Sequence, residues 1–153
     1  HYAVHGHTAA EIIASRADNK KPLMGLTSFK NDYITADDII IAKNYLTTDE
    51  LAALNNLVEQ YLIFAEGQAM RRKEMSMRDW LQKLDGFLQL NDRDILKDAG
   101  RISHLMAKEI AEREFDKFNS QRIYAQATQD DALDQAIARL GLHPAGPKET
   151  PSG

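Results

Sequence analysis

Apolar residues recur at steps of three and four along much of the chain, a pattern typical of helices with one buried face. The clearest stretch runs from Thr48 to Arg72, and its repeat is Leu51, Leu54, Val58, Tyr61, Leu62 and Ala65. A second stretch opens at Ser76, and its repeat is Met77, Trp80, Leu81, Leu84, Phe87 and Leu88. No segment alternates apolar and polar residues for long enough to form a strand, so the pattern predicts an all-α fold.

Helix starts are marked by a Ser, Thr or Asn that is followed three residues later by an acidic residue. In such a pair each side chain caps a backbone N–H group, and the carboxylate complements the helix dipole. The pairs are Thr8 with Glu11, Thr35 with Asp38, Thr47 with Glu50, Ser76 with Asp79, and Asn91 with Asp94. They predict helices over about 9–17, 36–45, 48–72, from 76 onward, and about 92–128. A last short helix is predicted over 131–140, ending at Gly141, because glycine readily forms the left-handed cap.

The predicted helix over 92–128 would be roughly 50 Å long, which exceeds the width of a compact domain of this size. We therefore expect its C-terminal half to project or to pair with another chain. Residues 1–142 are predicted to form one helical domain: a helix and a long loop over 1–34, then an irregular helical bundle with the long helix over 35–142. The tail over 143–153 contains three prolines and two glycines and is predicted to be disordered.

Composition narrows the class of protein. The chain has 19 basic and 23 acidic residues, and its formal net charge of −4 argues against a general nucleic-acid binder. It has no cysteine, which excludes disulfides and thiolate chemistry and suits a reducing compartment. No apolar stretch approaches the roughly 20 residues of a membrane span, so we expect a cytoplasmic protein. The chain starts at His1 without a signal pattern, and we expect a further segment to precede it.

Three of the five histidines fall within the first seven residues, at His1, His5 and His7. Imidazoles are common ligands of zinc and other transition metals, and Glu11 could add a carboxylate. The alternative is that His7 and Thr8 belong to a helix cap and that the other two histidines have no role. We expect no resident cofactor, and a divalent metal at this cluster is the alternative prediction.

The loop after the first predicted helix carries basic and hydroxyl side chains beside a glycine. Such a loop can hold an anion, and the candidates for contact with a ligand or nucleic acid are Arg16, Lys20, Lys21, Thr27 and Lys30. The alternative is a structured loop anchored by Met24, Leu26 and Phe29. The basic run 71–73 follows a predicted helix, where cations complement the dipole. No P-loop, nucleophile elbow or zinc-protease motif is present.

Several strings in the chain resemble the RhuM family of bacterial virulence-associated proteins. They are His1 to Ile13 (HYAVHGHTAAEII), Arg16-Ala17-Asp18, Met24 to Ser28 (MGLTS), Ala42 to Leu46 (AKNYL), Asp79-Trp80 with Phe87-Leu88, and Asp98-Ala99-Gly100 with Ile102-Ser103. The resemblance implies the C-terminal part of such a protein, following an N-terminal region that looks like a phage-type DNA-binding or antirepressor module. Some family members are joined to Fic-type domains, but the Fic histidine signature is absent here. The resemblance supplies no catalytic residues.

The sequence leaves three interpretations of the function. The leading hypothesis is a helical module for self-association or partner binding, which acts as a homo-oligomer or with a protein partner and serves an attached DNA-binding domain. The competing hypothesis is a metal-assisted hydrolase or nuclease that uses His1, His5, His7 and Glu11, because a bound metal can generate hydroxide at neutral pH. A third interpretation has Arg16, Lys20, Lys21, Lys30 and residues 71–73 contacting phosphates. No membrane partner is expected.

Overall fold

The computed structural model describes residues 1–141, and in that range it contains five α-helices, three short 3-10 turns and no strand. In chain order these are α1 (Tyr2–His5), α2 (Ala9–Arg16), η1 (Pro22–Gly25), η2 (Asp38–Ile40), η3 (Ala42–Tyr45), α3 (Thr48–Met70), α4 (Met77–Leu90) and α5 (His104–Arg139). The predicted all-α fold is confirmed. Among the described residues, no helix has the length and apolar character to cross a membrane. The tail predicted to be disordered, 143–153, lies outside the described residues.

Three of the predicted capping pairs form complete capping boxes, in which each side chain accepts a backbone N–H of the other residue. They are Thr8 with Glu11 at α2, Thr47 with Glu50 at α3, and Ser76 with Asp79 at α4. The three helices therefore begin where the sequence predicts. Their ends lie within two residues of the predicted ends where one was given, since α2 closes at Arg16 and α3 at Met70.

The prediction of an α-helix over 36–45 is wrong, because this segment forms 3-10 turns. Thr35 and Asp38 do form hydrogen bonds, but the chain from Asp38 onward forms two 3-10 turns separated by an extended Ile41 (φ −103°, ψ 107°). Three consecutive β-branched isoleucines weaken α-helix formation here. Side-chain hydrogen bonds satisfy two of the backbone carbonyls instead, because the Asn44 amide donates to the Asp38 carbonyl at 3.0 Å and the Tyr45 hydroxyl donates to the Ile39 carbonyl at 2.7 Å.

The start of the long helix was also predicted wrongly. Asn91 ends α4 rather than starting α5, since its side-chain amide donates to the Phe87 carbonyl at 2.8 Å. Asp92 then takes a left-handed conformation (φ +53°), and a segment without regular structure continues to the start of α5 at His104. At the other end, the helix predicted separately over 131–140 is a continuation of α5, which closes at Arg139 before a left-handed Gly141.

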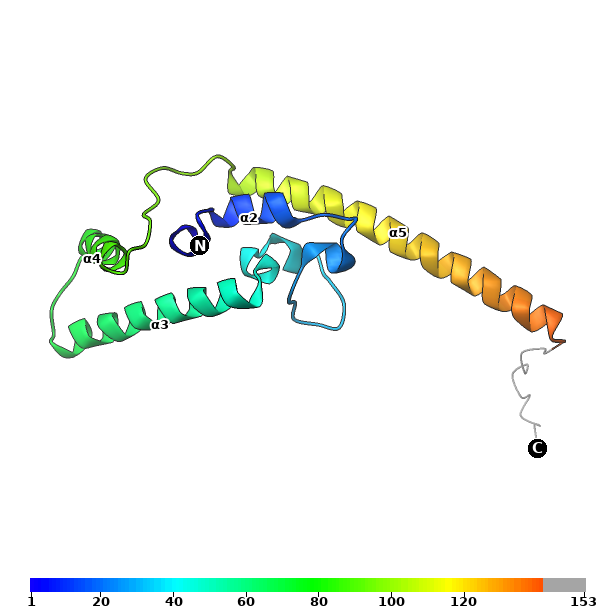
Figure 1. Cartoon of the computed structure of the whole chain (residues 1–153), viewed down its shortest axis with the longest axis horizontal. Coiled ribbons are helices and arrows are strands. Elements are labelled where there is room, and N and C mark those ends of the chain that lie inside the picture. The colour runs from blue at the N-terminus through cyan, green and yellow to red at the C-terminus, as the bar shows by residue number, and fades with distance from the viewer. Residues whose placement is uncertain (142–153) are drawn as a thin grey trace, which may run out of the picture. The chain divides into compact units, whose positions relative to one another are not determined.

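The chain divides into two compact units, His1–Asp116 and the part that begins at Lys117. The core of the first unit lies among α2, the three 3-10 turns and the start of α5. Its most deeply buried large side chains are Ile12, Ile13, Met24, Ile39, Tyr45 and Leu46, and Ala107 and Ala111 of α5 are also fully buried. Figure 1 shows α2 beside the first turns of α5, where the Asn19 backbone N–H donates to the Glu114 carboxylate at 3.0 Å.

Helices α3 and α4 contribute no buried residue to this core. They contact each other through aromatic side chains, and the Tyr61 hydroxyl donates to the Trp80 carbonyl at 2.9 Å. The Tyr61 ring lies 6.4 Å from Trp80, edge to face, and 5.7 Å from Phe87, measured between centroids. The rest of the apolar face predicted for α3 is only partly covered. Val58 is 49% and Leu62 is 61% exposed, whereas Leu51, Leu54 and Ala65 are half-buried.

Candidate functional site

The N-terminal segment meets a segment that is about ninety residues further along the chain. Glu11 closes the capping box of α2 with one carboxylate oxygen, and its other oxygen accepts the Arg101 backbone N–H at 2.9 Å. These hydrogen bonds, from Arg101 first and from Thr8 second, hold the pKa of Glu11 below its usual value. One oxygen of Glu11 therefore caps α2, and the other joins α2 to Arg101.

Gly100 is required at this contact for two reasons. Its φ of +78° lies in the left-handed region, and an added Cβ would lie 2.7 Å from the Thr8 methyl group. We predict that Gly100→Ala lowers the free energy of unfolding by about 2 kcal/mol. The loss should be smaller in a Thr8→Ser background, which removes that methyl group, and urea denaturation of the four chains measures this coupling. Equal losses in the two backgrounds would contradict the close contact.

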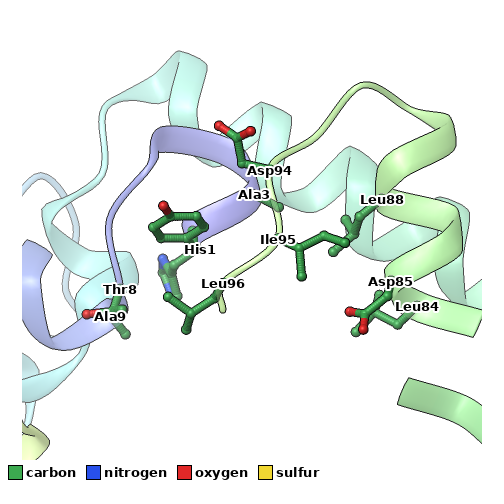
Figure 2. Close-up of a pocket in the computed structure, with 11 residues that line it drawn as sticks. His1, Ala3, Thr8, Ala9, Leu84, Asp85, Leu88, Asp94, Ile95 and Leu96 are labelled. Atoms are coloured by element: carbon green, nitrogen blue, oxygen red, sulfur yellow. The ribbon is translucent and has the colours of Figure 1, made fainter. Parts of the chain in front are cut away.

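Two hollows flank this junction, and Tyr2 and Leu96 line both. The larger, of about 560 Å³, has a mixed polar and apolar lining, and its polar residues include His7, Glu11, Ser15, Asp98 and Arg101. The smaller, of about 360 Å³, is mostly apolar, and its lining includes Ala3, Leu84, Leu88 and Ile95 (Figure 2). The second hollow brings together the N-terminal segment, α4 and the segment that follows it.

The four predicted metal ligands separate into two pairs. His1 Nδ1 lies 3.3 Å from His5 Nε2, and His7 Nδ1 lies 3.7 Å from Glu11 Oε2. Gly6, with φ +75°, ends α1 between the two pairs. Within the described residues, no three His, Asp or Glu side chains form a group that could hold a metal ion. The metal site thus remains a prediction without support from the arrangement of these side chains.

Arg16, predicted to contact a ligand or nucleic acid, has internal partners. Its guanidinium forms a bidentate ion pair with the Glu50 carboxylate, with hydrogen bonds of 2.6 and 2.7 Å. It also donates to the Tyr45 carbonyl at 2.9 Å. The ion pair raises the pKa of Arg16 and lowers the pKa of Glu50 to about 2. Arg16 therefore connects the end of α2 with the start of α3.

The other predicted contact residues lie on a loop that is ordered by internal bonds. The Thr27 hydroxyl lies within hydrogen-bonding distance of the Asn44 and Leu46 carbonyls, and Met24 and Leu26 are buried. Phe29 is half-buried, whereas Lys20, Lys21 and Lys30 are exposed. This arrangement agrees with the structured-loop alternative, and contact of the lysines with a ligand stays a prediction.

Sequence reasoning did not identify the apolar hollow or the role of Arg101. The apolar side chains of α4 were assigned to a bundle interior, and residues 95–102 were assigned to a helix. One signal was present, because a glycine between polar residues, as in Asp98-Ala99-Gly100-Arg101, often marks a turn with close approach of the backbone.

The site belongs to an all-α domain in which an N-terminal helical segment is joined to a distant loop and bordered by two hollows. The model of the Virulence protein RhuM family matches residues 1–126 of the chain. The chain therefore belongs to the RhuM family, as the resemblance indicated. No curated protein and no solved structure matches it.

Proposed function

We propose that this RhuM-family chain is a helical self-association module that pairs two copies through α3. The observation that carries the proposal is a stripe on this helix, here called the free face, in which no residue is fully buried and Asn55, Val58, Leu62 and Ala69 are exposed. Its residues recur at steps of four and three: Leu51, Asn55, Val58, Leu62, Ala65 and Ala69. This is the spacing of the contact positions in a coiled coil.

An antiparallel pair of α3 helices matches large side chains with small ones. With the two-fold axis at position 60, Val58 lies opposite the partner's Leu62, and Leu51 lies opposite the partner's Ala69. Facing positions that alternate in size can interdigitate without voids. In a parallel pair, by contrast, each residue would face its own copy, so leucines would meet leucines and alanines would meet alanines.

The charges favour the same register. Asp49 stands in the first turn of α3, and Arg71 follows its last turn. The antiparallel pair places Asp49 opposite the partner's Arg71, whereas a parallel pair would set like charges together at both ends. A two-fold pair uses the same surface on both copies, as most homodimers do. It would also present two copies of an attached DNA-binding domain, as binding to a two-fold symmetric DNA site requires.

The first test is the mass of the chain in solution. We predict a dimer by light scattering at high micromolar concentration, and we predict that Leu62→Glu weakens it at least about tenfold, because a carboxylate would be buried at the centre of the pair. Ile63→Glu is the matched control, since Ile63 is exposed to the same extent (63%) but lies about a quarter of a turn away. A monomer at these concentrations would overturn the proposal.

The register is tested by disulfide formation, because the chain has no cysteine of its own. We expect a mixture of Val58→Cys and Leu62→Cys chains to form a cross-linked heterodimer under mild oxidation. Neither chain alone should cross-link efficiently. If each variant instead forms a disulfide with itself, the helices are parallel and the antiparallel register is wrong.

A further inference from the structure

The apolar hollow beside α1 is lined by residues of the N-terminal segment, of α4 and of the segment that follows α4. Its apolar wall includes Leu84 and Leu88 of α4 and Ile95 and Leu96 of the following segment. In the view of Figure 2, the side chains of Ile95 and Leu88 lie between the carboxylates of Asp94 and Asp85. The hollow therefore combines an apolar floor with negative charge at its edges.

The apolar surface continues outside the hollow along α4. Met77 is 74% and Leu81 is 57% exposed, and both share a helix face with Leu84 and Leu88, at steps of four, three and four. This strip is about 16 Å long, since the four residues span eleven steps of 1.5 Å. Its length matches three turns of an amphipathic helix, which is the usual ligand of such a groove.

The charged residues that line the hollow determine whether a cationic or an anionic ligand is favoured. Asp85 and Asp94 are both acidic, no Lys or Arg lines the hollow, and His1 is the basic residue in its lining. Carboxylates at the edge of an apolar groove attract cationic side chains and repel anionic ones. We propose that the hollow and the exposed strip of α4 bind a basic amphipathic helix of a protein partner. This inference is independent of pairing through α3, because the two surfaces share no residue.

The test uses two designed helical peptides of about 18 residues with the same leucine spacing, one with lysine and the other with glutamate at its polar positions. The fluorescence anisotropy of each labelled peptide is followed as the full chain is added. We expect the Leu/Lys peptide to bind at least about tenfold more tightly than the Leu/Glu peptide, and its affinity to fall with added salt.

Substitutions in the chain show where the Leu/Lys peptide binds. We expect Asp85→Asn with Asp94→Asn to weaken the Leu/Lys peptide about fivefold, and Leu84→Gln with Leu88→Gln to abolish binding. Asp134→Asn, an exposed carboxylate on α5, is the matched control and should have no effect. Leu62→Glu should also leave the peptide affinity unchanged, so that a failure of pairing through α3 is distinguished from a failure of this proposal.

Three outcomes would overturn the inference. The first is equal affinity for the two peptides, and the second is Leu/Lys binding that is unchanged by the paired Asp substitutions. The third is a dimer of the chain that dissociates on Leu88→Gln, because a second copy would then occupy the hollow. The Asp variants alter only the edge of the hollow, so they remain informative if the leucine variants fail to fold.

Discussion

Replacing Gly25 by alanine is expected to lower the free energy of unfolding by about 3 kcal/mol or more. Gly25 has φ +83°, and an added Cβ would collide with the carbonyl oxygen of Arg16, a backbone atom at the end of α2. A backbone atom cannot rotate away as a side chain can. The collision would therefore separate the loop from α2 or distort the helix end.

The loop around Gly25 has little room to adjust. Leu23 and Met24 before it also have positive φ values, 52° and 57°, and Met24 is fully buried. The Asp18 backbone N–H donates to the Met24 carbonyl at 3.2 Å, which closes the loop against the end of α2. Left-handed conformations are costly for residues with a side chain, so this turn already uses part of the free energy gained by burying Met24.

Urea denaturation followed by circular dichroism measures the effect. Gly67→Ala is the matched control, because Gly67 lies in the interior of α3 and an added Cβ would meet no atom within 4 Å. That control should stabilise the chain by up to about 1 kcal/mol, owing to the higher helix propensity of alanine. If Gly25→Ala and Gly67→Ala had similar effects, the close approach of Gly25 to Arg16 would be wrong.

The features that could be predicted from the sequence are those that depend on neighbours a few residues apart. The Thr8, Thr47 and Ser76 caps each need only a carboxylate three residues later, and all three helices begin as predicted. Asn91 shows the limit of this signal. Its side chain can cap a helix start or bond to a carbonyl at a helix end, and the residues around it do not determine which.

The site depends on contacts that local patterns do not encode. Glu11 and Arg101 are joined across ninety positions, and Asn44 and Tyr45 bond to carbonyls that an α-helix would have used itself. The ring centroid of His7 lies 6.4 Å from that of His5, yet among the described residues no three such side chains form a group that could hold a metal ion. Histidines that are close in the sequence therefore do not form a set of metal ligands in this structure.

The ion pair between Arg16 and Glu50 gives the second large effect, a dependence of stability on pH. The carboxylate of Glu50 accepts two guanidinium hydrogen bonds and the Thr47 backbone N–H at 2.9 Å. Its pKa is about 2 in the folded chain, against an ordinary value of 4.5. Because the folded-state pKa is depressed, the stabilisation is fully present above pH 4.5 and is lost as the pH falls towards 2.

We expect Glu50→Gln to lower the free energy of unfolding by about 2 kcal/mol at pH 7, since hydrogen bonds to charged groups contribute about 1.5–3 kcal/mol. Glutamine can still act in the cap of α3, so the loss reports the ion pair rather than the start of the helix. The difference between the two chains should shrink steadily from pH 4.5 to pH 2, because protonation of Glu50 in the unfolded wild-type chain removes its advantage. Glu74→Gln, which neutralises an exposed carboxylate outside the helices, is the control and should differ from wild type by a constant, small amount. A Glu50→Gln deficit that stayed constant across this range would contradict the ion pair, because the loss would then not depend on the charge of Glu50.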